Sequence, residues 1–237
     1  ERRRGTEAAV LFGKYQLERV IGRGRSGTVF LARHLGLDEE RAIKRVRRTE
    51  SGFIQEAALL KRLRHPGIPI IYDLEIDENY YYLIEEYLCG ESLYARIERT
   101  GSLQTGELIR LGIELCRIMN YLHSFKPNPI LYLDLHPGNL LICREQLKLI
   151  DFDQAALASL SQERSVCYGT KGFAAPEQYE GGTLDERTDI YAIGALLYYM
   201  GTGHAPEGEI KAGQGSCWGD LYILMGRCLR TEKKERC

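Results

Sequence analysis

Strand-like segments fill the first third of the chain, and helical patterns dominate the rest. Three early segments, YQLERVIG, GTVFLARH and ERAIKRV, lie between residues 15 and 46 and are rich in β-branched and aromatic residues. Two more strands are expected around residues 68–74 and 80–84. Such segments, broken by glycines and charges, are typical of an antiparallel sheet. A strand-rich front followed by a helical back predicts an α+β fold with two lobes.

Two amphipathic helices and one buried helix can be placed by periodicity. FIQEAALLKRLRH, residues 53–65, predicts a helix that HPG ends, and ELIRLGIELCRIMNYLHSF, residues 107–125, predicts a second. The apolar run over residues 190–200 is too short to cross a bilayer and indicates a core helix. Residues 151–176 are expected to be irregular, after a short strand LKLI. The positions expected to face the core are Phe53, Ala57, Leu60 and Leu63, then Leu108, Leu111, Leu115, Ile118 and Leu122.

These patterns divide the chain into three parts. Residues 1–14 are an expected N-terminal extension, residues 15–86 an N-lobe made of a small antiparallel sheet and one main helix, and residues 87–237 a mainly helical C-lobe. A cleft between two lobes is the natural ligand site. The charged end RTEKKERC carries no closing signal, so the C-terminus is expected to be truncated.

Composition narrows the classes of function. The 237 residues carry a formal net charge of −1, so no global field attracts nucleic acid or acidic lipid. We therefore expect no nucleic-acid partner and no membrane contact from this segment, with any membrane tether lying outside it. Seven scattered cysteines without a C-x-x-C pair argue against a zinc site and a disulfide framework, and favour a reducing, cytoplasmic setting.

A glycine loop lies between the first two predicted strands. Gly22, Gly24 and Gly27 form a G-x-G-x-x-G-x-V pattern that ends at Val29. A dinucleotide-binding fold would need a helix directly after the glycines, but Thr28 and the residues after it favour a strand. A strand–turn–strand loop lets backbone N–H groups approach phosphates without side-chain obstruction. The loop is therefore consistent with a nucleotide site, but it does not establish one.

Polar residues interrupt an apolar run, LYLDLHPGNLLIC, at residues 131–143. Asp134, His136 and Asn139 lie between segments typical of short buried strands, where unpaired polar groups are costly. The run is either a plain loop between two strands or a catalytic loop, and other motifs must decide.

Further motifs follow in a fixed order along the chain. AIK contains Lys44, Glu56 lies on the next helix, and Asp134 precedes Asn139 in D-x-x-x-x-N spacing. IDFD, AAPEQY and DERTDIYAIG come later and contain Asp151, Glu177 and Asp189. In this order the motifs resemble the protein kinase family, of the serine/threonine (eukaryotic-like) type found in bacteria. The resemblance covers roughly residues 15–236.

The resemblance implies a role for each matching residue. Lys44 would hold the α/β-phosphates of ATP and be oriented by Glu56, while Asp134 would orient the substrate hydroxyl and accept its proton late. Asn139 and Asp151 would bind Mg²⁺, with Mn²⁺ as the other candidate ion, because hard cations prefer carboxylate and amide oxygens. The residues implied to bind the nucleotide are Ile21, Gly22, Gly24, Gly27, Val29, Ala42, Lys44, Glu86, Leu88 and Leu141.

The implied reaction is transfer of the γ-phosphate of Mg-ATP to Ser and Thr hydroxyls of proteins. The segment GTKGFAAPEQY supports protein substrates, since Thr170 matches the family's serine/threonine specificity and Glu177 would pair with Arg236. Two alternatives stay open: a small-molecule kinase of the aminoglycoside or choline type, and a catalytically weak pseudokinase scaffold. The substrate, the activating signal and the oligomeric state are not determined by the sequence.

Several positions depart from the family. Its His-Arg-Asp triplet is Tyr132-Leu133-Asp134 here, and because Leu133 cannot bind phosphate, we expect that phosphorylation at Ser165 or Thr170 is not the main activating step. Tyr132 is expected to pack under Phe152.

Three more departures lie at or near the implied nucleotide and catalytic sites. His136 replaces the usual lysine, as in small-molecule kinases, and Asp153 replaces a glycine and should stiffen the backbone. Glu85 lies where an apolar residue or threonine guards the adenine pocket, so it must be paired, protonated or turned to water.

The remaining histidines and a tyrosine cluster are expected to have structural rather than catalytic roles. His65 is expected at a helix end, and His34, His123 and His204 at the surface or in turns. Residues 80–82, all tyrosine, are expected to pack a strand on its sheet.

Overall fold

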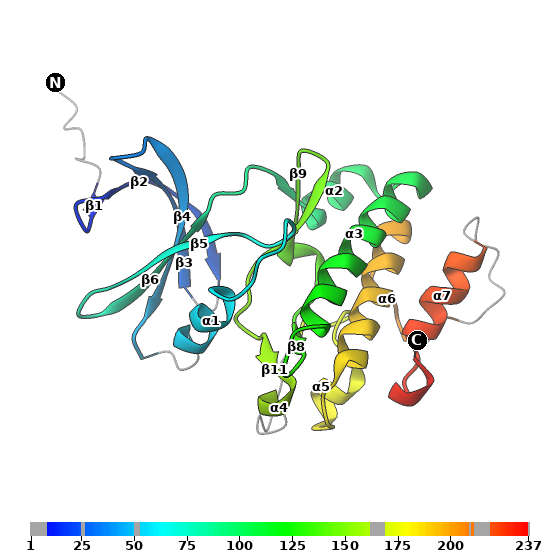
Figure 1. The fold of residues 1–237 in the computed structure, drawn as a ribbon. Coiled ribbons are helices and arrows are strands. Elements are labelled where there is room, and N and C mark those ends of the chain that lie inside the picture. Colours follow the sequence, from blue (N-terminus) through cyan, green and yellow to red (C-terminus); the bar gives the residue numbers. More distant parts are fainter. Residues whose placement is uncertain are drawn as a thin grey trace. The chain divides into compact units, whose positions relative to one another are not determined.

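The computed structural model describes residues 9–24, 27–49, 53–161, 169–208, 210 and 219–236 (Figure 1). The chain divides into two compact units. The first comprises residues 1–64 and 69–89, and the second comprises residues 65–68 and 90–237. Each unit has its own core, and the predicted α+β class is confirmed.

A six-stranded sheet forms the first unit, in the order β1-β2-β3-β4-β6-β5, and every neighbouring pair is antiparallel. Strand β1 pairs with β2 and lies within the segment predicted as an extension. The three early strands were predicted at the right places. The strands are β1 (Val10–Leu11), β2 (Tyr15–Gly24), β3 (Gly27–His34), β4 (Glu39–Arg47), β5 (Ile71–Ile76) and β6 (Tyr80–Glu86).

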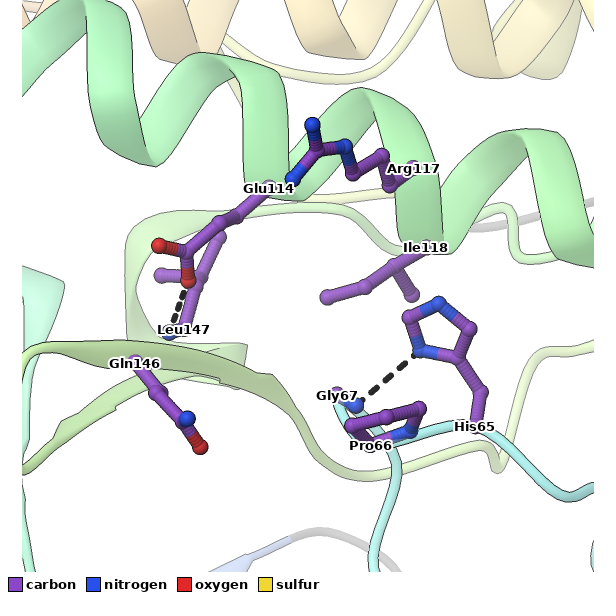
Figure 2. Close-up of a pocket in the computed structure, with 8 residues that line it drawn as sticks. All are labelled: His65, Pro66, Gly67, Glu114, Arg117, Ile118, Gln146 and Leu147. Atoms are coloured by element: carbon purple, nitrogen blue, oxygen red, sulfur yellow. Dashed lines mark hydrogen bonds between the residues drawn. The ribbon is translucent and has the colours of Figure 1, made fainter.

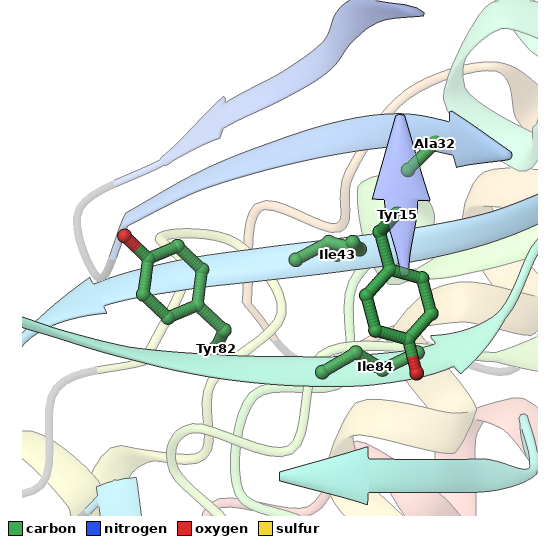
Figure 3. Packing of buried hydrophobic residues seen from close by; sticks show 5 residues of the cluster. All are labelled: Tyr15, Ala32, Ile43, Tyr82 and Ile84. Atoms are coloured by element: carbon green, nitrogen blue, oxygen red, sulfur yellow. The ribbon is translucent and has the colours of Figure 1, made fainter. Parts of the chain in front are cut away.

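One face of this sheet carries a buried hydrophobic cluster (Figure 3). Ile43 and Ile84 are fully buried at its centre, on cross-strand partner positions of β4 and β6. Alternate residues of a strand point to opposite faces, so the residues between them lie on the other face. The buried cluster consists of Tyr15, Ala32, Ile43, Tyr82 and Ile84.

Helix α1 (Phe53–Leu60) is shorter than its sequence predicts. It ends at Leu60, before HPG is reached. The next residues form i→i−3 hydrogen bonds, from Arg62 N to Leu59 O and from Leu63 N to Leu60 O, in place of the α-helical i→i−4 pattern. The predicted inner face is confirmed, since Phe53, Ala57, Leu60 and Leu63 are all buried. Phe53 stacks on Tyr81 with ring centroids 5.3 Å apart.

The second unit is built around helix α6 (Glu186–Thr202), which packs against α3 (Thr105–His123) and α7 (Asp220–Cys228). Small residues allow these close approaches: a Cβ on Gly112 of α3 would lie 2.8 Å from Leu197, and one on Gly194 of α6 would lie 2.5 Å from Cys228. The predicted face of α3 is confirmed, because its five named apolar positions are all buried.

Shorter elements complete the second unit. They are β7 (Glu91–Ser92), α2 (Leu93–Thr100), β8 (Ile130–Leu131), β9 (Leu140–Cys143), β10 (Gln146–Leu149), β11 (Ala156–Leu157), α4 (Ala158–Ser161) and α5 (Pro176–Glu180), with 3-10 turns at Pro137–Asn139 and Lys233–Glu235.

Two of these elements correct the expectation of an irregular 151–176 segment. Strand β11 pairs with β8, and α4 follows it directly. Helix α2 was not predicted either, although its N-cap is regular: Ser92 Oγ accepts from Ala95 N at 3.1 Å. Within the described part of the chain, no helix combines the length and the hydropathy needed to cross a membrane.

Candidate functional site

In the first unit, β-sheet register places the predicted nucleotide-binding side chains on one face. Val29 lies opposite Lys44, and Ala42 lies two residues from Lys44 on the same strand. Cross-strand partners and alternate residues share a face, so these three side chains lie together, on the face opposite the Ile43–Ile84 cluster. Gly22 pairs with Val29 at the same edge.

The glycine loop closes tightly at Gly27. A Cβ there would lie 2.3 Å from the carbonyl oxygen of Arg45, so this position accepts no other residue without a backbone shift. Gly24 pairs with Gly27 at the ends of β2 and β3, as the strand–turn–strand prediction requires. Residues 25–26 at the turn itself lie outside the described residues.

The other predicted residues of the first unit lie at the ends of its elements or on the same face. Ile21 lies on β2, Glu86 is the last residue of β6, and Leu88 follows it and is half-buried. Glu85 lies opposite Ala42, on the Lys44 face. Lys44 is buried, with 6% of its surface exposed. Glu56 belongs to α1, but its side chain lies outside the described residues.

In the second unit, Asp134 lies on a loop whose backbone is bound by Asp189. This carboxylate, 1% exposed at the start of α6, accepts from Tyr132 N at 2.9 Å and from Leu133 N at 2.8 Å. His123 Nε2 lies 2.9 Å from the same carboxylate. His123 was predicted as a surface or turn residue, and this is corrected. Its side chain is only 16% exposed and contacts the carboxylate that binds the loop.

The apolar residue at position 133 has a packing role. Leu133 is buried with Leu131 and Leu184 in one cluster, although its φ of 67° is unusual for a branched side chain. Its carbonyl accepts from Gln178 Nε2 at 2.7 Å. An arginine at position 133 could not stay in this apolar cluster. The leucine that replaces the family's arginine is therefore matched by the packing around it. The periodicity of the sequence indicated neither the hydrogen bond from Gln178 nor the contact of His123 with Asp189.

Tyr132 fills the position of the family's histidine and contacts Phe152 edge to face, with ring centroids 5.2 Å apart, as predicted. Its hydroxyl lies 2.8 Å from the carbonyl oxygen of Asp151. Burial, followed by the nearby carboxylates of Asp151 and Asp134, raises the pKa of Tyr132 well above its ordinary value. The ring thus stays neutral and ties the Asp151 backbone to the loop.

The two oxygens of the Asp134 carboxylate have different surroundings. Its Oδ1 accepts from Thr170 Oγ1 at 2.9 Å, while Oδ2 lies 3.8 Å from His136 Nε2. A distance of 3.8 Å is too long for a hydrogen bond. The Asp134 side chain is 26% exposed.

Asn139 and Asp151 fit the chemistry of a divalent cation. The amide nitrogen of Asn139 donates to the Asp134 carbonyl at 3.1 Å, so its oxygen is left as the ligand atom. Asp151 is exposed, with a φ of 61°. Among the described residues, no group of three or more His, Cys, Asp or Glu side chains could hold a metal ion. A cation would therefore need further oxygens, such as those of phosphates.

Several further residues singled out in the sequence have the following positions. Asp153, which replaces a glycine, is not among the described residues with positive φ, so aspartate is accommodated there without left-handed strain. Leu141 lies on β9 and is half-buried. Ser165 lies outside the described residues, and the Thr170 hydroxyl is bound to Asp134 rather than to a basic residue.

Glu177 and Arg236 form the predicted pair. Arg236 Nη1 and Nη2 donate to the two carboxylate oxygens of Glu177 at 2.6 and 2.9 Å, and the arginine side chain is fully buried. Burial tends to raise the pKa of Glu177, but the hydrogen bonds from Arg236 lower it below its usual range.

A separate pocket of about 300 Å³ lies between α3, β10 and residues 65–67, and Figure 2 shows the residues that line it. Two of its polar side chains form hydrogen bonds within the fold: Glu114 Oε2 accepts from Leu147 N at 2.7 Å, and His65 Nδ1 accepts from Gly67 N at 3.0 Å. No predicted site residue lines it. His65 lies five residues after α1 ends, so its predicted place at the helix end is corrected to a turn.

Comparison with known proteins gives a consistent picture. The family model described as protein kinase domain matches residues 15–217. The chain is 35% identical over 209 residues to the serine/threonine-protein kinase PrkC of Bacillus subtilis, covering 83% of this chain and 32% of that protein. It is 32% identical over 213 residues to the serine/threonine-protein kinase PknB of Mycolicibacterium smegmatis, covering 83% and 33%.

A mammalian relative is similar to the same degree. The sperm motility kinase 3A of Mus musculus is 32% identical over 201 residues, covering 83% of this chain and 39% of that protein. The chain thus spans about a third of the length of the bacterial relatives it matches.

Proposed function

Because the chain belongs to the protein kinase domain family, we propose that it transfers the γ-phosphate of ATP to serine and threonine hydroxyls of proteins. The observation that carries this proposal is the state of Asp134. Its Oδ1 accepts from Thr170 Oγ1, its side chain is 26% exposed, and Asp189 binds the backbone N–H groups of the two preceding residues.

We assign the residues the following roles. Lys44 contacts the α/β-phosphates, with Glu56 orienting it, and Asn139 and Asp151 bind the divalent cation, which we propose is Mg²⁺ with Mn²⁺ as a substitute. The cation neutralises phosphate charge when bound. The residues proposed to hold the nucleotide are Ile21, Gly22, Gly24, Gly27, Val29, Ala42, Glu86, Leu88 and Leu141.

The protein residues position the reaction more than they drive it. A carboxylate is a far weaker base than an alkoxide, so Asp134 cannot remove the hydroxyl proton before the new P–O bond begins to form. It orients the hydroxyl through Oδ2 and accepts the proton as the new P–O bond forms. Phosphoryl transfer depends on positioning and electrostatic stabilisation, which such an arrangement supplies.

Two features support protein over small-molecule substrates. Thr170 contacts Asp134 at one end of residues 170–177, and the Glu177–Arg236 pair anchors the other end. In protein kinases this segment forms the peptide platform.

The exposed thiols of Cys89 and Cys116 support a reducing, cytoplasmic setting.

Purified wild-type chain and Asp134→Asn test the proposal with labelled ATP, Mg²⁺, generic protein substrates and small alcohols. We expect transfer to the protein substrates, lost on chelation of the metal, and a decrease of at least about 100-fold in Asp134→Asn with ATP affinity retained. Transfer only to small alcohols would establish the small-molecule alternative. Nucleotide binding without any transfer would establish a scaffold.

A further inference from the structure

A second pocket lies in the second unit and shares no residue with the proposed site. Helices α3 and α7 both pack against α6, and a groove of about 370 Å³ is lined by side chains of all three helices (Figure 1). This volume is within the range of small-molecule sites. None of the described residues that line the groove has a predicted catalytic, nucleotide-binding or metal-binding role. The groove therefore needs an explanation of its own.

The walls of the groove are apolar side chains that the fold leaves exposed. Ile109 and Ile113 of α3 are 46% and 48% exposed, and Leu224 of α7 is 42% exposed. Leu197 of α6 is buried beneath them, where Gly112 of α3 packs against it. A single exposed apolar side chain is ordinary, but several around one cavity indicate a binding surface.

The strongly polar side chains lie at one end of the groove. Arg117 and Asn120 are three residues apart on α3, so they lie on the same face of the helix. The other end is lined by Leu108 and Ile109, eight residues or more before Arg117. The groove thus has one polar end and one apolar end, as an amphiphilic ligand requires.

The guanidinium of Arg117 is available to such a ligand. Arg117 is exposed, and no hydrogen bond or ion pair joins it to another residue in the described part of the chain. Glu114, three residues earlier on α3, has both carboxylate oxygens bound, Oε2 by Leu147 N at 2.7 Å and Oε1 by Arg110 Nη1 at 3.3 Å. Arg117 therefore presents a positive charge beside an apolar groove, which is complementary to a ligand with one anionic head group.

The length of the groove along α3 sets the size of the apolar part of the ligand. From Leu108 to Arg117, the helix rises by about 14 Å at about 1.5 Å per residue. An extended carbon chain advances about 1.3 Å per bond, because bonds of about 1.5 Å alternate at tetrahedral angles. A chain of about 12 carbons therefore matches the apolar stretch.

We propose that the groove binds the free anion of a fatty acid with about 12 carbons. Its carboxylate binds Arg117, whose paired N–H donors match two carboxylate oxygens, and the amide of Asn120. Its tail lies along Ile113, Leu197 and Leu224, so that apolar surface of both ligand and protein is removed from water. This site goes beyond the proposed function and does not depend on phosphate transfer.

Titration calorimetry of the 237-residue chain with sodium dodecanoate, kept below its micellar concentration, tests the proposal. We expect one site per chain. Affinity should fall about tenfold for each two methylenes removed, from dodecanoate to decanoate and octanoate, because each buried methylene stabilises the complex. Dodecanol, which lacks the charge, should bind about fivefold more weakly than dodecanoate.

The thiol of Cys116 reports on occupancy of the groove itself. Cys116 lines the groove, whereas Cys89 is exposed outside it. Bound dodecanoate should slow the alkylation of Cys116 by iodoacetamide and leave the rate at Cys89 unchanged. Mass spectrometry of the peptides that contain each thiol measures both rates in one sample.

Two pairs of variants locate the tail and the head of the ligand. Ile113→Glu places a charge in the groove and should weaken dodecanoate binding at least about tenfold. Ile223→Glu, at a similarly exposed isoleucine that does not line the groove, should leave binding unchanged. Arg117→Gln should weaken binding about fivefold, and Arg227→Gln, exposed on α7 outside the groove, is its control. Thermal unfolding shows whether each variant is folded.

Saturable binding, protection of Cys116 and the expected order of the variants would support the site. Absence of dodecanoate binding, equal alkylation of Cys116 at saturation, or equal affinity of Ile113→Glu and Ile223→Glu would overturn it. Equal affinity for dodecanol and dodecanoate would exclude the anion. Association of the chain that protects Cys116 without ligand would show an interface between copies instead. If Ile113→Glu does not fold, the series of chain lengths and the Cys116 rates of the wild type decide.

Discussion

Asp189 shows how one buried side chain can support a loop of several residues. It is 1% exposed and satisfies two consecutive backbone N–H groups, those of Tyr132 and Leu133. Those groups would otherwise be buried without partners, which is costly. The positive φ of Leu133 is held by the same bonds and by Gln178 on its carbonyl.

We predict that Asp189→Asn lowers the free energy of unfolding by about 1–3 kcal/mol, because the amide offers one acceptor oxygen where the carboxylate offers two. Urea unfolding followed by circular dichroism measures the change. Asp220→Asn, an exposed acid in the first turn of α7, is the matched control and should change stability by no more than about 0.5 kcal/mol. Equal unfolding midpoints for wild type and Asp189→Asn would contradict the prediction.

At the scale of elements, the start of α6 depends on Asp185. This N-cap carboxylate accepts from Arg187 N at 2.9 Å and pairs with Lys233 Nζ at 3.0 Å. Burial tends to raise the pKa of Asp185, but hydrogen bonds from Arg187 and Lys233 dominate and lower it to about 2. The helix that carries Asp189 is thus capped by a charged group.

The pH dependence of stability follows from this lowered pKa. The unfolded pKa is about 3.9, so the contribution of Asp185 is complete above that value and is lost as pH falls through about 2. Asparagine caps helices as well as aspartate, so Asp185→Asn removes only the charge.

We expect Asp185→Asn to be about 1–2 kcal/mol less stable than wild type at pH 7, after allowance for solvent screening. That difference should shrink between about pH 4 and pH 2. Unfolding measured in urea across this range tests it, and a difference independent of pH would show that the charge is not responsible.

At the scale of the whole molecule, each unit has a core of its own, and the second unit is closed by a contact between distant parts of the chain. Arg236 is fully buried and also donates to the carbonyls of Arg230 and Thr231. Its partner Glu177 lies 59 residues earlier. The end of the described chain is therefore part of the second unit's interior.

Arg236→Ala should leave the Glu177 carboxylate buried without its partner and lower the free energy of unfolding by about 3–5 kcal/mol. For a chain of this size the Tm should fall by about 10 °C in calorimetry. Lys234→Ala, an exposed neighbour, is the control and should leave the Tm nearly unchanged. The double variant Glu177→Gln with Arg236→Met should recover part of the loss, and failure of Arg236→Ala to lower the Tm would refute the pair's importance.

The sequence by itself determined the elements with strong periodicity. The apolar positions of α3 and the inner face of α1 follow from spacing alone, since a helix must bury one stripe. The ordered motifs identified the family, which the comparison with known proteins confirms. Tyr132 against Phe152 and Glu177 with Arg236 were also predicted from motif positions and are present.

Only the tertiary structure decided the long-range polar contacts and the short elements. The end of α1 at Leu60, the strand β11 and the place of His123 beside Asp189 depend on partners far away in the chain. Periodicity records which side of an element is apolar, whereas a hydrogen bond between residues 123 and 189 exists only once the chain has brought them together.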